Sequence, residues 1–150
     1  MSIKIFRAKK KNSKAILELI DELAKFEKLA PPDDKAKKRI IKDAFGKNPA
    51  FDVLCAEKNG SIIAYAFYFF TYSSFMARRT LYLEDIFISE KYRGEGIGKA
   101  LMDKLLKIAQ KNKCARMEWC VLDWNTNAIN FYEKLGARLL KEWNYYRIDL

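Results

Sequence analysis

The feature that most constrains the fold is a strand, a glycine-rich turn and a long helix that follow one another between residues 81 and 112. Leucine, tyrosine, isoleucine and phenylalanine crowd positions 81–88, as a buried strand requires. Three glycines then stand at alternate positions, Gly94, Gly96 and Gly98. Apolar residues recur at helical spacing after them, at Ile97, Leu101, Leu105 and Ile108. A glycine turn that opens a helix gathers free N–H groups at the positive end of the helix dipole and binds phosphate. Arg93, at the entrance, can add a bidentate contact to a phosphate.

The composition limits the chemistry that the chain can perform. It has 150 residues, enough for one domain over residues 1–150 with a sizeable core. Histidine is absent, which removes the usual general base and the usual zinc ligand, so we expect no metal. Three cysteines without metal-ligand spacing fit a reducing cytosol, and we expect a cytoplasmic protein. The apolar run 62–72 is too short to cross a membrane and no signal peptide is visible, so we expect no membrane partner.

The net charge of +10 is uneven along the chain. The first 48 residues carry 14 basic and 7 acidic side chains, and the remaining 102 carry 15 and 12. A basic surface suits polyanionic partners, but a solvated lysine-rich surface explains it as well. The clusters Lys9–Lys11 and Lys37–Arg39 lack the interleaved aromatic residues of a nucleic-acid site. We therefore do not expect nucleic acid as a partner.

Strand and helix patterns alternate irregularly along the chain, which predicts an α+β fold with a mixed sheet and helices on its faces. Asn59-Gly60 predicts a tight hairpin, and the segment 81–122 predicts a crossover between two parallel strands. Asn12 or Ser13 is expected to cap the first helix, and Asp34 the second. The expected strands are 3–8, 51–57, 61–72, 81–88, 115–122 and one or two within 138–150. The expected helices are 13–26, 34–45, 97–112 and 125–135.

Arg93-x-x-Gly96-x-Gly98, between a strand and a helix, resembles the acetyl-CoA signature of the GNAT superfamily of N-acetyltransferases. The order of elements resembles that fold over the whole chain, which implies a mostly antiparallel central sheet with a parallel, splayed strand pair. Further stretches resemble the spermidine/spermine (diamine) N-acetyltransferase branch: Leu81 to Gly98, Trp124 to Ala137, Tyr68 to Tyr72 and Phe26-Glu27.

The resemblance implies acetyl-CoA as co-substrate. Main-chain groups of the strand and the glycine turn would hold its pantetheine arm and its diphosphate, and residues near 125–132 would complete the site. The implied contacts are Ile86, Phe87, Ile88, Arg93, Gly94, Glu95, Gly96, Ile97, Gly98, Lys99, Asn125, Asn127 and Tyr132. For Asn125, helix capping is an alternative role that is compatible with binding.

Two residues match the family's catalytic groups, Glu84 as general base and Tyr132 as general acid. An amine of pKa ~10.4 lies ~3.4 pH units above neutrality, so freeing its lone pair costs ~4.6 kcal/mol at pH 7. A carboxylate beside the amine can take that proton. Strand side chains alternate, so we expect Asp85 to point to the opposite face from Glu84. The alternative for either acid is to pair with a buried lysine or arginine, and for Tyr132 to be a core residue.

The acceptor implied by the branch is a small primary amine, a polyamine, a diamine or a lysine-like amino acid, acetylated by direct transfer in a ternary complex. The implied amine-binding residues are Phe26, Glu27, Glu84, Glu118, Trp119 and Cys120. Cys120 itself has no activating base and is expected to be a core residue. The resemblance also implies a homodimer, with Trp143–Tyr146 as a plausible contact. Two alternatives stay open: acetylation of a protein amine, N-terminal or lysine, and a non-enzymatic nucleic-acid-binding or regulatory module on the same fold.

Overall fold

A computed structural model describes residues 2–150 and shows an α+β fold built on one five-stranded sheet of order β1-β2-β3-β4-β5. The first four strands pair antiparallel, and β4 and β5 pair parallel, so the predicted mixed sheet with one parallel pair is confirmed. The strands are β1 (Lys4–Arg7), β2 (Asp52–Lys58), β3 (Ser61–Ser73), β4 (Arg78–Ile88) and β5 (Arg116–Glu118).

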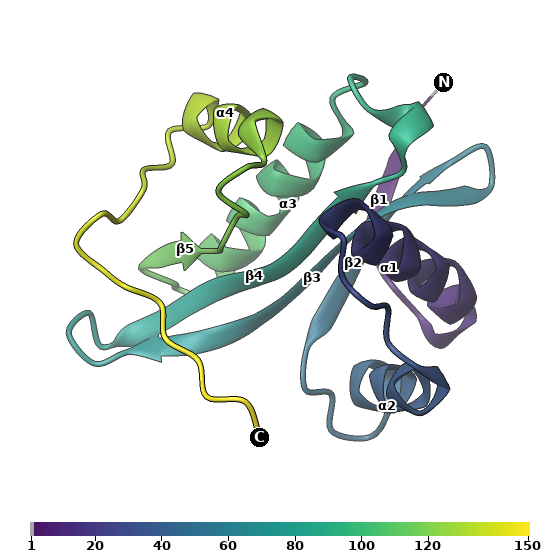
Figure 1. The fold of residues 1–150 in the computed structure, drawn as a ribbon, viewed down its shortest axis with the longest axis horizontal. Helices are drawn as coiled ribbons and strands as arrows, with labels where there is room; N and C mark the ends of the chain where they lie inside the picture. Colours follow the sequence, from purple (N-terminus) through teal and green to yellow (C-terminus); the bar gives the residue numbers. More distant parts are fainter. Residues whose placement is uncertain (1) are drawn as a thin grey trace. The chain divides into compact units, whose positions relative to one another are not determined.

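Four α-helices and two short 3₁₀ helices accompany the sheet. They are η1 (Lys10–Asn12), α1 (Ser13–Glu27), α2 (Asp34–Phe45), η2 (Glu90–Tyr92), α3 (Ile97–Lys111) and α4 (Thr126–Lys134). In Figure 1, α1 and α2 lie on one face of the sheet and α3 lies on the other. On the α1 face, Ile16 and Leu19 pack in a buried cluster with residues that include Val53, Cys55 and Tyr65. On the other face, α3 buries an apolar stripe that begins at Ile97.

Asn59 and Gly60 form the hairpin that joins β2 to β3. Their φ angles of 53° and 78° are both positive, as the tightest two-residue hairpin turn requires. This turn sets the register, which runs from Lys58 opposite Ser61 to Asp52 opposite Tyr68. The prediction from the Asn-Gly pair is therefore confirmed.

A β-bulge interrupts β4 at Glu84. Leu83 lies opposite Tyr68 and Asp85 lies opposite Phe67, so Glu84 is the extra residue between them. The extra residue reverses the alternation, and Asp85 shares the α1 face with Phe67, which packs against the buried cluster there. Our prediction that Asp85 points away from the face of Glu84 is therefore wrong, because strict alternation holds only for an unbroken strand.

Other local predictions need correction. No strand forms within residues 138–150 of the described chain, so the one or two strands expected there are wrong. β5 covers three residues, much less than 115–122. Asp33, not Asp34, caps α2 by accepting a hydrogen bond from the N–H of Ala36 at 2.7 Å. Asn12 precedes α1, but its side chain accepts from the N–H of Lys9, which lies outside the helix.

The described chain comprises two compact units, one up to Trp119 and a second from Cys120 to Leu150. The first unit contains the whole sheet with α1, α2 and α3, and the second contains α4. A single domain over residues 1–150 stays a prediction. Among the described residues, none of the helices is long and apolar enough to cross a membrane.

Candidate active site

Three carboxyl groups of the first unit come together at the bulge, and we call Glu27, Glu84, Asp85 and the hydroxyl of Tyr65 the acidic cluster. Glu84 and Asp85 lie on β4, Tyr65 lies on β3, and Glu27 is the last residue of α1. The Tyr65 hydroxyl donates a hydrogen bond to Oδ2 of Asp85 at 3.2 Å. The partner of Asp85 is thus a neutral hydroxyl from a neighbouring strand. This bond does not support the alternative that Asp85 pairs with a buried lysine or arginine.

Burial and nearby negative charge raise the pKa values of Asp85 and Glu27. Burial, and then the charges of Glu84 and Glu27, raise the pKa of Asp85 to about 6, although the hydrogen bond from Tyr65 opposes the shift. Burial, and then the charge of Glu84, also raise the pKa of Glu27 above its ordinary value. Glu84 itself is exposed. The acidic cluster therefore concentrates negative charge that an ammonium group would neutralise.

The glycine turn, residues 93–98, has the backbone geometry of an anion site. Gly94 and Gly96 have φ angles of 79° and 81°, and a Cβ added to either would meet nothing within 4 Å. Gly96 is the N-cap of α3. It has no side chain that could accept a hydrogen bond from the first N–H groups of the helix. The ladder of α3 begins at Ala100, whose N–H bonds to the carbonyl of Gly96 at 3.0 Å. The N–H groups of residues 97–99 are therefore free for a phosphate, and the turn fits the diphosphate of CoA.

The charged side chains of the turn are engaged elsewhere. Lys58 of β2 forms an ion pair with Glu95, which offsets a negative charge where an anion would bind. Lys99 pairs with Asp103 at 2.7 Å, one helical turn further along α3. Glu95 and Lys99 can thus offer an anion their main-chain N–H groups, as predicted, while their side chains stay paired.

Arg93 lies against the sheet and α1. Its Nε donates a hydrogen bond to the carbonyl of Ile88 at 3.0 Å. Its guanidinium carbon lies 5.1 Å from the ring centroid of Phe26 and 5.3 Å from that of Phe87. These contacts use Nε and the faces of the guanidinium, so a bidentate phosphate contact would come from its two terminal nitrogens, and that contact stays a prediction.

On the edge of β4 that does not pair with β3, only the short strand β5 pairs with the main chain. Within the described residues, the ladder between these strands ends where Tyr82 lies opposite Glu118. The segment from Leu83 to Ile88, which includes the predicted contacts Ile86, Phe87 and Ile88, therefore forms a sheet edge that pairs with no strand, although the carbonyl of Ile88 accepts a hydrogen bond from Arg93. An extended amide chain could pair with such an edge.

Three other predicted amine-binding residues, Glu118, Trp119 and Cys120, lie at the end of β5 and just after it, and their role in binding an amine stays a prediction. Glu118 ends β5, and its carboxylate accepts from Nε of Arg116 at 3.0 Å. Trp119 ends the first unit. Cys120 is exposed and belongs to the second unit, so it is not the core residue we expected.

The second unit holds the remaining predicted residues. Asn125 caps α4, because its side chain accepts a hydrogen bond from the N–H of Ala128 at 3.3 Å. The capping role is therefore confirmed. Asn127 and Tyr132 lie on α4, where the rings of Phe131 and Tyr132 are 5.4 Å apart between centroids. Their roles in cofactor binding and catalysis stay predictions.

Tyr65 and Lys58 are functional candidates that sequence reasoning missed. Tyr65 is fully buried, and its hydroxyl needs the partner that Asp85 provides. Two consecutive acidic residues, Glu84 and Asp85, interrupt an otherwise apolar strand. This break in the pattern could have indicated the bulge from the sequence. The ion pair of Lys58 with Glu95 joins residues 37 positions apart and left no local signal.

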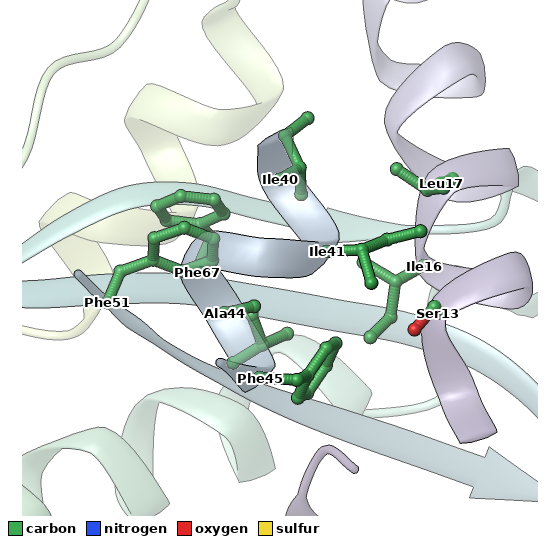
Figure 2. Close-up of a pocket in the computed structure, with 10 residues that line it drawn as sticks. Ser13, Ile16, Leu17, Ile40, Ile41, Ala44, Phe45, Phe51 and Phe67 are labelled. Carbon is green, nitrogen blue, oxygen red and sulfur yellow. The ribbon is translucent and has the colours of Figure 1, made fainter. Parts of the chain in front are cut away.

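An apolar cavity of about 10 Å³ lies between α1, α2 and the sheet, and none of the predicted site residues line it. Figure 2 shows its lining side chains, including the rings of Phe51 and Phe67, whose centroids are 3.7 Å apart. A cavity needs about 10–15 Å³ to hold one water molecule. This space is therefore a packing gap in the core rather than a ligand site.

Known proteins resemble the chain in sequence and in fold. Residues 15–137 match the acetyltransferase (GNAT) family. Thialysine N-epsilon-acetyltransferase of Sus scrofa is 36% identical over 159 residues, covering 99% of this chain and 93% of that protein. Spermidine/spermine N(1)-acetyltransferase-like protein 1 of Homo sapiens is 35% identical over 144 residues, covering 89% of this chain and 21% of that protein.

A solved structure of AAC(6')-Iy in complex with the bisubstrate analog CoA-S-monomethyl-acetylneamine superposes with a TM-score of 0.82. It covers 100% of both chains at 18% identity, which establishes likeness of fold alone. The family match spans most of the chain and includes the glycine turn and the bulge. The chain therefore belongs to the acetyltransferase (GNAT) family and is an N-acetyltransferase.

Proposed function

We propose that this enzyme transfers the acetyl group of acetyl-CoA to the primary amine of a small molecule, a lysine-like amino acid, a diamine or a polyamine. The observation that carries the proposal is the meeting of Glu27, Glu84 and Asp85 at a bulge of the strand that leads into the glycine turn. The amine-acetylating relatives support this class of acceptor, because a thialysine enzyme matches over 99% of this chain.

The acidic cluster is proposed to bind and deprotonate the amine. Negative charge on the cluster attracts an ammonium ion, whose proton must leave before the nitrogen can attack. Glu84, exposed at the bulge, takes this proton directly or through one water molecule. Glu27 and Asp85 supply the surrounding field. The net charge of +10 does not oppose this role, because the charges close to the amine set its binding free energy while distant charges mainly set association rates.

The glycine turn and the open edge of β4 are proposed to bind the co-substrate. Acetyl-CoA supplies an acetyl group activated as a thioester. Main-chain N–H groups of Gly94 to Lys99 would hold its diphosphate, and main-chain groups of Ile86 to Ile88 would hold its pantetheine arm and stabilise the developing oxyanion. Asn125 and Asn127 are proposed to assist from the second unit. These contacts place donor and acceptor in one ternary complex.

The transfer balances without a metal or a covalent enzyme intermediate. A bond forms between the amine nitrogen and the acetyl carbon, and the bond from that carbon to sulfur breaks. Glu84 takes one proton from the ammonium group before attack and passes it to solvent after the transfer. The nitrogen loses its second proton as the amide forms, and that proton reaches the departing sulfur directly or through water, while the hydroxyl of Tyr132 is proposed to donate a hydrogen bond to this sulfur. A tyrosine hydroxyl is ~1.5 pH units weaker as an acid than a thiol, so hydrogen bonding carries more of this role than full proton transfer.

A screen of acceptors with acetyl-CoA tests the proposal, with free thiol release as readout. The panel is thialysine, lysine, putrescine, spermidine, spermine, an N-terminal peptide and a lysine-containing peptide. We expect thiol release with at least one small amine at a kcat/KM well above that of either peptide. If only a peptide is acetylated, the enzyme is a protein acetyltransferase and the small-amine proposal fails.

We also propose that the enzyme is a cytoplasmic homodimer. Its three cysteines are free, which suits a reducing compartment. The C-terminal segment leaves Trp143, Tyr146 and Ile148 mostly exposed, and a second copy would cover this apolar surface. Sedimentation velocity should give a dimer that Trp143→Ser weakens. A monomer at all concentrations would refute the dimer.

A further inference from the structure

Arg93 joins two parts of the candidate active site that are far apart in the sequence. It opens the glycine turn, yet its guanidinium carbon lies 5.1 Å from the ring centroid of Phe26, in the last turn of α1. Phe87 of β4 lies 5.3 Å away. The bond from Nε to the carbonyl of Ile88 fixes the plane of the guanidinium. Arg93 therefore contacts the strand, the turn and the helix at once.

The same face of α1 makes a second contact with this region. Ser89, which precedes η2, donates a hydrogen bond from its hydroxyl to Oε2 of Glu22 at 3.2 Å. Glu22 and Phe26 are four residues apart and so lie one above the other on the helix. Ser89 and Arg93 flank η2, and each contacts this face of α1, Ser89 through Glu22 and Arg93 through Phe26.

The last turn of α1 also belongs to the acidic cluster. Glu27 directly follows Phe26. The charge of Glu27 raises the pKa of Asp85, and the charge of Glu84 raises the pKa of Glu27. Any shift of this turn of α1 changes both the stacking on Arg93 and the position of the Glu27 carboxyl group. The last turn of α1 therefore contacts the glycine turn through Phe26 and contributes Glu27 to the proposed amine site.

We propose that Arg93 is a positioning residue that couples the two substrate sites, so that binding of CoA at the glycine turn strengthens binding of the amine at the acidic cluster. The inference rests on the proposed function. Binding at the turn fixes Arg93, Arg93 fixes Phe26 by stacking, and Phe26 fixes Glu27. Coupling between two ligands is reciprocal, so the amine must strengthen CoA binding by the same factor. A direct phosphate contact by Arg93 would not require Phe26.

Calorimetry on the full chain tests this coupling. The dissociation constant of CoA is measured with and without saturating thialysine, and the ratio of the two values is the coupling factor. The variants are Phe26→Leu, which removes the ring and keeps the arginine, and Arg93→Lys, which keeps the charge and removes the planar stack. Phe75→Leu is the matched control, because it makes the same change at a side chain that is 98% exposed.

We expect a coupling factor of about fivefold or more in the wild type and in Phe75→Leu. It should fall towards one in Phe26→Leu, in Arg93→Lys and in the double variant, with no further loss in the double variant. A factor of one in the wild type, or an unchanged factor in Phe26→Leu, would overturn the proposal. The proposal would also be overturned if the reductions in the coupling factor caused by Phe26→Leu and by Arg93→Lys multiplied in the double variant, because the two residues would then act independently.

Failure of the proposed function gives a different result. If thialysine and the other small amines neither bind nor accept acetyl groups, the acceptor class is wrong. The affinity for CoA alone then decides the role of Arg93. Phe26→Leu should weaken it about two- to fivefold, as expected for one lost cation–π contact. Unchanged CoA affinity in Phe26→Leu would show that stacking does not position Arg93.

Discussion

The acidic cluster and the glycine turn lie at successive points along the same chain segment, but they are built from different groups. The acidic cluster depends on ionisable side chains from β3, β4 and α1, whose charges are set by burial and by one another. The glycine turn depends on main-chain N–H groups, whose direction is set by two positive φ angles. The acidic cluster should therefore respond to pH, and the glycine turn to backbone strain.

The largest expected effect comes from removing the base. Glu84→Gln should lower kcat about 100-fold at pH 7, because the protonated amine loses its acceptor. Activity should recover in part as pH rises and more of the amine is uncharged. Stopped-flow or steady-state rates across pH 6–10 measure this, with Glu90→Gln as a control on an exposed carboxyl. An unchanged pH–rate profile would reject Glu84 as the base.

The next effect tests the backbone side of the comparison. Gly96→Val should weaken CoA binding about 10- to 100-fold, because a β-branched residue at φ 81° strains the turn by about 1–3 kcal/mol. The Cβ of the new residue would meet nothing within 4 Å, so the loss is expected from backbone strain rather than from a clash of that atom. Gly60→Val is the matched control at φ 78° in the β2–β3 hairpin. It should lower stability while CoA affinity, measured by calorimetry, stays near the wild-type value. Equal affinity losses in both variants would remove the special role of the turn.

A third prediction concerns stability and pH. The pKa of Asp85 is about 6 in the folded protein and about 3.9 in an unfolded chain. Between these values the folded state holds the proton more tightly, so the contribution of Asp85 to stability is fully present below about pH 4 and is lost as pH rises through 6. Asp85→Asn should match the wild type at pH 4 and exceed it by about 2 kcal/mol at pH 8. Urea unfolding at both pH values measures the difference, and an equal difference at both would contradict the assigned burial.

The smallest expected effect lies outside both regions. Tyr132→Phe should lower kcat about tenfold, because one hydrogen bond to the developing thiolate is lost. CoA affinity should stay within about twofold, since the diphosphate and pantetheine contacts remain. Rates and calorimetry on the same preparation separate the two quantities. Full activity in this variant would leave Tyr132 as a structural residue of α4.

Features governed by local sequence could be predicted, and those governed by distant pairing could not. Asn59, Gly60, Gly94 and Gly96 adopt positive φ angles, and the local sequence indicates these conformations. The bulge at Glu84 and the bond from Tyr65 to Asp85 depend on the register between β3 and β4. The contacts of Arg93 with Phe26 depend on how α1 packs. The strands expected within 138–150 also depend on distant pairing, since a strand needs main-chain partners on a neighbouring strand and this segment joins no sheet.

A crystal structure with a bisubstrate analogue, in which CoA is joined through its sulfur to the side-chain amine of lysine, tests the central claim most directly. We predict that its diphosphate lies on the main-chain N–H groups of residues 94–99. We predict that its amine nitrogen lies within hydrogen-bond reach of the Glu84 carboxylate, directly or through one water molecule. A diphosphate bound elsewhere, or an amine remote from Glu84, would contradict the account.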